Sequence, residues 1–174
     1  MSEAPDYVGP IEAWRLWLVV SKLDSLRLAS VVYDVVWSPA KPLVAACLHA
    51  QRSPMHPWRK TPPAHTVPDP SCQCGIYAID DPCKLNSYLD SSYVGRRALH
   101  RVVGRVSLWG TVIECERGWR AAYAYPAHLY VPLGDPAGAA AEYIARELGG
   151  YGVPVEIVSN TRPRELLGVL AKAA

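Results

Sequence analysis

The chain has 174 residues, of which 50% are hydrophobic and 20% charged, which is enough to bury one core and predicts a single domain over residues 1–174. Its net charge of +2 excludes a nucleic-acid binder that works through bulk charge, so such a role would need local clustering of cations. No apolar run approaches the length of a transmembrane helix, and we therefore expect no membrane partner.

The first residues predict a short lead-in and then a strand. Residues 1–10 carry two prolines and a glycine and are expected to form a loose N-terminal segment. The run AWRLWLVV at residues 13–20 is short and rich in β-formers, which predicts a strand. Residues 21–25 are expected to form the turn that follows it.

Two further strands are expected before the most unusual part of the chain. Residues 26–37 carry apolar side chains on both faces of an extended backbone, which is typical of a central strand. Residues 38–42 contain two prolines and break that strand. A third strand at residues 43–48 would then deliver Cys47 to the segment beyond.

The long segment 47–78 concentrates the chemistry of the chain, because it holds three of the five cysteines and three of the five histidines. Between Leu48 and Cys72 there are six prolines and no apolar periodicity of helical or strand type. A structureless loop of this length is unusual in a compact domain unless something ties it down. A bound metal would offset the entropy lost on ordering the loop, so we predict a metal-clasped loop.

Four side chains in this loop form a Cys3His set that suits zinc: Cys47, His65, Cys72 and Cys74. The C-x-C spacing is tighter than the common C-x2-C, and Gly75 directly after it allows the chain to turn sharply. Four protein ligands leave no coordination position for water, which indicates a structural rather than a catalytic metal.

Other assignments stay open at this point. His49 or His56 could replace His65, and Cys83 could replace one thiolate. A [2Fe-2S] cluster on the same residues is the redox alternative, and ordinary buried thiols are the alternative without metal. A disulfide framework is disfavoured by the odd number of five cysteines and by an opening sequence without a signal peptide, so we expect a cytoplasmic protein.

A short helix is expected after the loop. Residues 75–79 form a brief apolar segment that leads to two aspartates. Asp81 is suited to the N-cap and Pro82 to the first helical position, which predicts a helix that ends near Leu89.

The strongest β pattern of the chain lies at residues 99–114. Its apolar and small residues alternate to form one core face, while the other face presents Arg101, Arg105 and Trp109. A turn at residues 116–118 is expected to return the chain as a second strand at residues 119–125.

The returning strand places Trp119 and Tyr123 on one face, so the predicted ligand-binding set on the sheet is Arg101, Arg105, Trp109, Trp119 and Tyr123. Arginines and aromatic rings on a sheet face suit a protein or small ligand. The same face, with Arg96 and Arg97 before it, also suits single-stranded nucleic acid, and residues 95–120 hold six Arg against two Glu. The alternative is that a loop or helix covers this face and the rings belong to the core.

The last third of the chain predicts a helix, a strand and a helix. Residues 136–148 are good helix formers that end at two glycines, residues 155–158 are β-formers, and residues 160–173 carry an apolar helical face of three leucines. Strands first and then helix, strand and helix indicate an α+β fold with an antiparallel sheet core. The sequence contains none of the nucleotide-binding, nucleophile-elbow or zinc-protease motifs, and we predict no catalytic residue.

One pattern resembles a known family. The residues His65-x-x-Pro68-x-x-x-Cys72-x-Cys74-Gly75-Ile76-Tyr77-Ala78, followed by Gly104 to Gly110 and Gly118 to Ala121, are similar to a family of bacterial, mainly actinobacterial, proteins. The resemblance spans most of residues 13–158. It implies that these pieces belong to one unit, and it implies no reaction.

Overall fold

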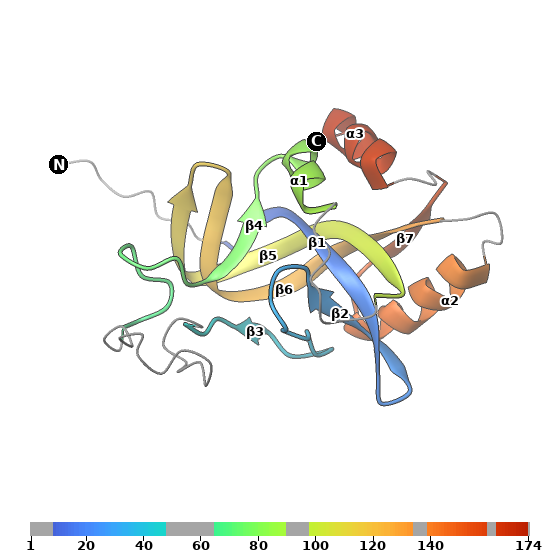
Figure 1. Cartoon of the computed structure of the whole chain (residues 1–174), viewed down its shortest axis with the longest axis horizontal. Helices are drawn as coiled ribbons and strands as arrows, with labels where there is room; N and C mark the ends of the chain where they lie inside the picture. The colour runs from blue at the N-terminus through green and yellow to red at the C-terminus, as the bar shows by residue number, and fades with distance from the viewer. Residues whose placement is uncertain (1–8, 48–64, 90–97, 134–138, 160–162, 174) are drawn as a thin grey trace, which may run out of the picture.

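A computed structural model describes residues 9–47, 65–89, 98–133, 139–159 and 163–173. Within these ranges the chain forms an α+β fold, as predicted: a seven-stranded, mostly antiparallel sheet with helices packed on it (Figure 1). That residues 1–174 make one domain stays a prediction. No helix in the described ranges is long and apolar enough to cross a membrane.

Four strands pair in a closed ring. β1 (Ile11–Lys22) pairs with β5 (His100–Cys115), and β5 pairs with β6 (Gly118–Pro132). β4 (Ile76–Ile79) pairs with β6 and closes the ring against β1 through one residue pair, between Ile79 and Trp14. The junction of β4 with β1 is therefore the weakest side of the ring.

Three more strands extend the ring at its edges. β2 (Ser25–Ser30) forms a hairpin with β1 and lies on the same edge of β1 as β4 does. β3 (Leu43–Val44) runs antiparallel to β6 next to the β4 pairing, and β7 (Val155–Val158) runs parallel to the end of β6. β6 is thus the strand on which most of the sheet is assembled.

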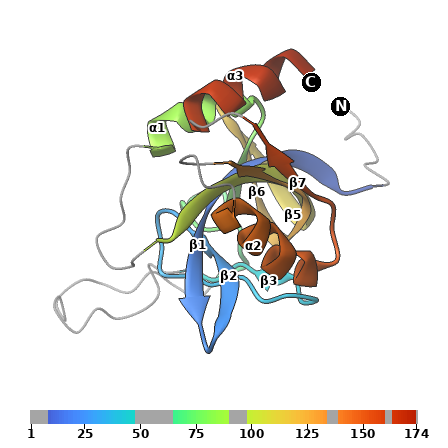
Figure 2. The ribbon, with the colours of Figure 1, turned by 90° about the vertical axis from the view of Figure 1, so that its right-hand side faces the viewer.

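The two faces of the sheet carry separate cores, and helices lie on both (Figure 2). On one face Trp17 and Val106 pack with α2 (Ala139–Leu148). On the other face Leu16 and Val103 pack with the 3-10 helix η2 (Pro82–Leu85), α1 (Asn86–Leu89) and α3 (Pro163–Ala173). The predicted core face of β5 is correct, and its other face is covered where α3 lies.

The predicted helices are found where the structure describes them. Asp81 caps η2 by accepting a hydrogen bond from the backbone N–H of Cys83 at 2.8 Å, with Pro82 in the first turn. The apolar face of α3 is buried as predicted, at Leu166, Leu167 and Leu170. Residues 136–138, the predicted start of α2, lie outside the described residues.

The predicted strand at residues 26–37 is wrong in its second half. β2 ends at Ser30, whose N–H donates to the carbonyl of Val35, and the chain doubles back so that the N–H of Trp37 donates to Leu28. The return places the Trp37 ring edge-on against Trp17, with ring centroids 5.5 Å apart. Burial of Trp37 against Trp17 stabilises the turn. Local β propensity does not predict this contact.

Two strand boundaries also differ from the prediction. β6 continues past the expected end at residue 125, through Pro126 and on to Pro132. A shift of register between Arg105 and Val106 accommodates Pro126, which has no N–H to donate to the ladder. The third predicted strand, at residues 43–48, is reduced to Leu43–Val44 in the described residues.

Candidate metal centre

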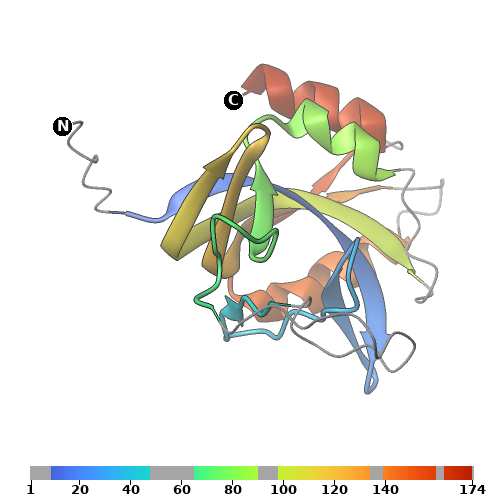
Figure 3. The ribbon, with the colours of Figure 1, turned by 60° about the vertical axis from the view of Figure 1, so that its left-hand side comes forward.

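The four predicted metal ligands meet at one point of the fold. Cys47 lies just after β3, whereas His65, Cys72 and Cys74 lie on the segment that leads into β4. That segment and the strand β4 are drawn in green in Figure 3. Both strands pair with the same edge of β6: Leu43 of β3 opposite Ala124 and Ile76 of β4 opposite Ala121. The shared partner strand therefore brings Cys47 next to the C-x-C turn.

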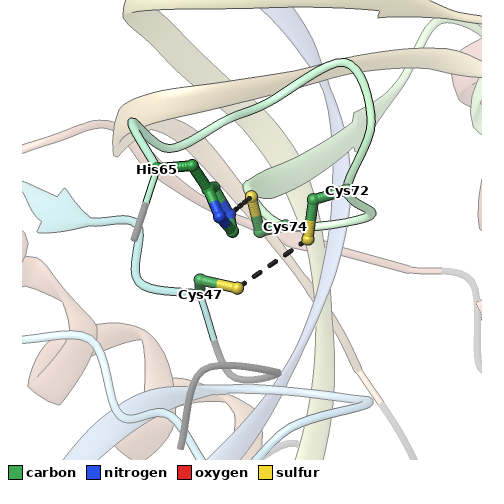
Figure 4. Close-up of side chains that lie close together, drawn as sticks. All are labelled: Cys47, His65, Cys72 and Cys74. Carbon is green, nitrogen blue, oxygen red and sulfur yellow. Dashed lines mark hydrogen bonds between the residues drawn. The ribbon is translucent and has the colours of Figure 1, made fainter. Parts of the chain in front are cut away.

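The four side chains point toward one another (Figure 4), and their ligand atoms all lie within 4.8 Å of each other. The Sγ atoms of Cys47 and Cys72 are 3.8 Å apart, and Cys74 Sγ is 3.4 Å from His65 Nε2. Tetrahedral zinc, with bonds of about 2.3 Å to sulfur and about 2.0 Å to nitrogen, requires separations of about 3.8 Å and about 3.5 Å. These two separations match a tetrahedral ion, and all four donor atoms lie close enough together to hold one ion.

None of the five cysteines forms a disulfide. Cys83, the alternative thiolate, lies exposed on η2, where its Sγ is 4.0 Å from the carbonyl oxygen of Leu167 on α3. The fifth thiol, Cys115, lies at the end of β5, 3.7 Å from the carbonyl oxygen of Ile113. His49 and His56, the alternative histidines, lie outside the described residues.

A buried arginine supports the C-x-C turn. Arg120 of β6 is only 7% exposed, and its Nη1 donates hydrogen bonds to the carbonyl oxygens of Cys72 and of Cys74, the latter at 3.0 Å. Three thiolates and one histidine around Zn²⁺ carry a net charge of −1, which the Arg120 guanidinium balances. Such groups behind the ligands fix ligand orientation and raise metal affinity.

Local hydrogen bonds shape the turn itself. The Asp69 carboxylate accepts hydrogen bonds from the side chain and the backbone N–H of Ser71, which hold the pKa of that carboxyl below its usual value. Gly75 has φ +126°, and a Cβ there would lie 3.1 Å from the Cβ atoms of Arg120 and Pro68. The sharp turn expected after the second thiol is present, and it requires glycine.

The ligands differ in their access to solvent. Cys74 is buried, whereas Cys47, His65 and Cys72 are half-buried. Because all four positions of a tetrahedral ion would be filled by protein, the centre has no open position for substrate. The arrangement is that of a clasp which joins the end of β3 to the start of β4.

The predicted ligand-binding set on the sheet is only partly brought together. Trp109 and Tyr123 stack on each other with ring centroids 6.1 Å apart and an angle of 16°. Arg105 pairs with Glu12 at 3.2 Å and lies over the ring of Trp14.

The two remaining members of that set are half-buried. Trp119 packs against the core on the α2 face of the sheet, and Arg101 lies on β5. Arg96 and Arg97 lie outside the described residues. Ligand binding by the set stays a prediction.

Sequence reasoning missed Arg120 as part of the metal centre. The side chain of an arginine in a strand cannot be told from a solvent-facing one until the pairing of β4 with β6 is known.

Comparison of this chain with protein-family models, with curated proteins and with solved structures finds no match. The resemblance to a mainly actinobacterial family therefore stays a prediction. What the protein does has to be argued from its own site.

Proposed function

We propose that this protein is a binding module stabilised by a structural zinc ion, which is held by Cys47, His65, Cys72 and Cys74. The observation that carries the proposal is the convergence of four donor atoms to within 4.8 Å, from segments that are far apart in sequence. Zinc favours this ligand set and this geometry, and a structural site contributes directly to the free energy of folding.

The geometry supports zinc over the iron-sulfur alternative. In a [2Fe-2S] cluster each iron takes two protein ligands, so ligands on different irons are separated by the two metals and their bridging sulfides. The observed contacts, 3.8 Å between Cys47 and Cys72 and 3.4 Å between Cys74 and His65, belong to a set compact enough for one ion.

The partner is a protein or a small ligand rather than nucleic acid. Three of the six arginines within residues 95–120 have partners within the chain. Arg105 pairs with Glu12, Arg120 donates to the C-x-C turn, and Arg117 donates to the carbonyl oxygen of Lys84 at 2.9 Å. Fewer free cations remain to contact phosphates. We also infer a cytoplasmic location, because reduced thiols persist there.

Metal analysis tests the proposal directly. Protein purified without an affinity metal column should contain one zinc per chain by elemental analysis and should be colourless. Cys74→Ser should lose the zinc together with thermal stability, because it removes a buried ligand. Cys83→Ser is the matched control, since it removes a thiol that lies on η2 away from the cluster.

Other outcomes would redirect or refute the proposal. If the protein contained iron and absorbed visible light, the [2Fe-2S] cluster would be supported in place of zinc. Protein without bound metal that also fails to take up added zinc would refute the clasp, as would equal metal loss in Cys74→Ser and Cys83→Ser.

A further inference from the structure

A cavity of about 360 Å³ opens beside the metal centre, where the strand ring is weakest. Along the edge of β1, pairing with β4 stops at Trp14 and pairing with β2 begins at Trp17. We call the part of this edge at residues 15 and 16, which pair only with β5 on the other edge, the seam. The cavity lies at the seam and is lined mainly by apolar side chains, among them Val31, Leu43 and Ile76. Its volume is in the range of small-molecule sites.

Arg15 is the cation of this cavity. It projects from the seam, donates from Nη1 to the carbonyl oxygen of Tyr77 on β4, and donates from Nη2 to Ser30 Oγ at 3.1 Å. Its guanidinium also lies over the ring of Trp37, 5.1 Å from the centroid. It therefore bridges β2 and β4, which do not pair with each other.

No carboxylate among the described residues pairs with Arg15, and its Nε is buried without a hydrogen-bond partner. Burial lowers the pKa of Arg15 to about 10, so the side chain is still protonated at neutral pH. The other half-buried arginine that lies over a tryptophan, Arg105, differs in having Glu12 as its counter-ion. The cavity thus combines an apolar wall with a positive charge that no carboxylate among the described residues compensates.

We propose that this cavity binds a small amphipathic carboxylate, whose charged end meets Arg15 and Ser30 and whose apolar body lies against Val31, Leu43 and Ile76. The guanidinium prefers carboxylates because its N–H groups form charge-assisted hydrogen bonds with both oxygens. Each Nη atom of Arg15 carries a second N–H besides the one that bonds Tyr77 or Ser30, which leaves donors for a carboxylate. The apolar walls select against small hydrophilic anions.

The metal centre is expected to control the shape of this cavity, a step that rests on the proposed function. One wall is formed by residues 43–46 and continues directly into Cys47. A second wall includes Gln73, Cys74 and Gly75. A zinc ion bound to Cys47 and Cys74 would hold these two walls at a fixed separation, and loss of the ion should weaken carboxylate binding.

Calorimetric titration with octanoate, 1-octanol and acetate tests the charge and the apolar requirement together. Octanoate should bind at one saturable site, whereas octanol should bind at least about tenfold more weakly because it lacks the charge. Acetate should show no binding because it lacks the apolar body. Saturable binding with equal affinity for octanoate and octanol, or no octanoate binding at millimolar concentration, would overturn the proposal.

Two variants locate the site. Arg15→Met should remove the preference for octanoate over octanol, while Arg146→Met, which alters an arginine on α2 outside the cavity lining, should keep it. Because Arg15 also bridges two strands, Arg15→Met could fail to fold, and Val44→Trp provides an independent test. Val44 lines the cavity and is 61% exposed, so a tryptophan there should block octanoate without disturbing the core. Unchanged octanoate binding in Val44→Trp or in folded Arg15→Met would refute the site.

The same titration on metal-free protein separates this inference from the zinc proposal. Octanoate binding that depends on Arg15, in protein that is purified without metal and takes up no added zinc, would retain the carboxylate site and reject the zinc clasp. One bound zinc together with no octanoate binding would have the opposite meaning. Binding that weakens at least about tenfold on zinc removal would establish the coupling of the two walls.

Discussion

Arg120 Nη1 lies 3.0 Å from the carbonyl oxygen of Cys74, which places a buried cation directly behind the metal-binding turn. The same nitrogen donates to the carbonyl oxygen of Cys72. One side chain on β6 therefore orients two of the four ligands, although it does not itself coordinate metal.

Replacement of this cation should weaken zinc binding without removing a ligand. We expect Arg120→Met to lower zinc affinity by about 10- to 100-fold, the range typical of groups behind metal ligands. Competition with a chromophoric chelator measures the effect. Arg117→Met is the control, because Arg117 is exposed and contacts Lys84 rather than the turn. Equal zinc affinity in Arg120→Met and wild type would show that the turn is oriented without the guanidinium.

Tyr151 should make the fold sensitive to alkaline pH. Its hydroxyl donates to the carbonyl of Trp37 at 2.7 Å and accepts from the N–H of Leu28 at 2.9 Å, and burial raises its pKa to about 12. Above pH 10 the unfolded chain loses the phenolic proton while the folded chain keeps it. The contribution of the protonated Tyr151 hydroxyl to the free energy of unfolding is therefore fully present below pH 10. It is lost between pH 10 and pH 12, which lowers the free energy of unfolding by about 2 to 3 kcal/mol.

Urea unfolding of wild type and Tyr151→Phe from pH 8 to pH 12 measures this effect. The variant should be less stable at pH 8, by about 1 to 3 kcal/mol, because the buried N–H of Leu28 loses its acceptor. Between pH 10 and pH 12 the free energy of unfolding of Tyr151→Phe should fall less than that of wild type. Tyr143→Phe alters an exposed tyrosine and should keep the wild-type profile. Parallel curves for wild type and Tyr151→Phe above pH 10 would contradict the assignment.

Gly118 should tolerate no side chain, because it begins β6 with φ +139° against β4. A Cβ at this position would lie 2.2 Å from the carbonyl oxygen of Ala78. We expect Gly118→Ala to lower the free energy of unfolding by about 2 to 4 kcal/mol through backbone strain and overpacking. Gly149→Ala, where a Cβ would meet nothing within 4 Å, should change it far less. Chemical denaturation compares the two, and equal effects would argue against a tight approach of β4.

A single-stranded DNA oligonucleotide should show no salt-dependent binding. Arg105, Arg117 and Arg120 already have partners within the chain, so fewer of the described cations in residues 98–120 remain to displace counterions from phosphates. Fluorescence anisotropy between about 50 mM and about 200 mM salt tests the expectation. An affinity that falls linearly in a log-log plot against salt would revive the nucleic-acid alternative.

The clustering of Cys47, His65, Cys72 and Cys74 could be predicted from sequence, because the signal for it resides in residue type and spacing. The C-x-C-G pattern at residues 72–75 predicts a turn that brings two thiolates together. The long proline-rich loop before it predicts a cross-link or metal that holds the loop in place. Arg120 and Arg15 could not be predicted in their roles. Each is an arginine in a strand, and only the pairing of distant strands decides whether such a side chain meets a carbonyl, a ring or water.

The errors in predicting the fold from the sequence have the same origin. Residues 31–36 contain strong β-formers, yet the chain turns there because burial of Trp37 against Trp17 outweighs local extension. Val103 lies between Arg101 and Arg105 on the face of β5 that was expected to bind a ligand, and it is fully buried under the helices of the second core. Contacts between elements that are not neighbours in sequence decide both cases. Such contacts cannot be predicted from the alternation of apolar and polar residues.

The arrangement of strands also has a consequence for the order of folding. β5 and β6 are joined by a two-residue turn, so their pairing closes short loops, whereas Ile11 of β1 must find Leu108 of β5 across most of the chain. The β5–β6 hairpin is therefore expected to form early, since its loop-closure entropy is small. β3 and β4 can add to β6 only after that hairpin exists, and the metal ligands meet later still. Zinc should then act as a latch that slows unfolding and leaves the folding rate nearly unchanged.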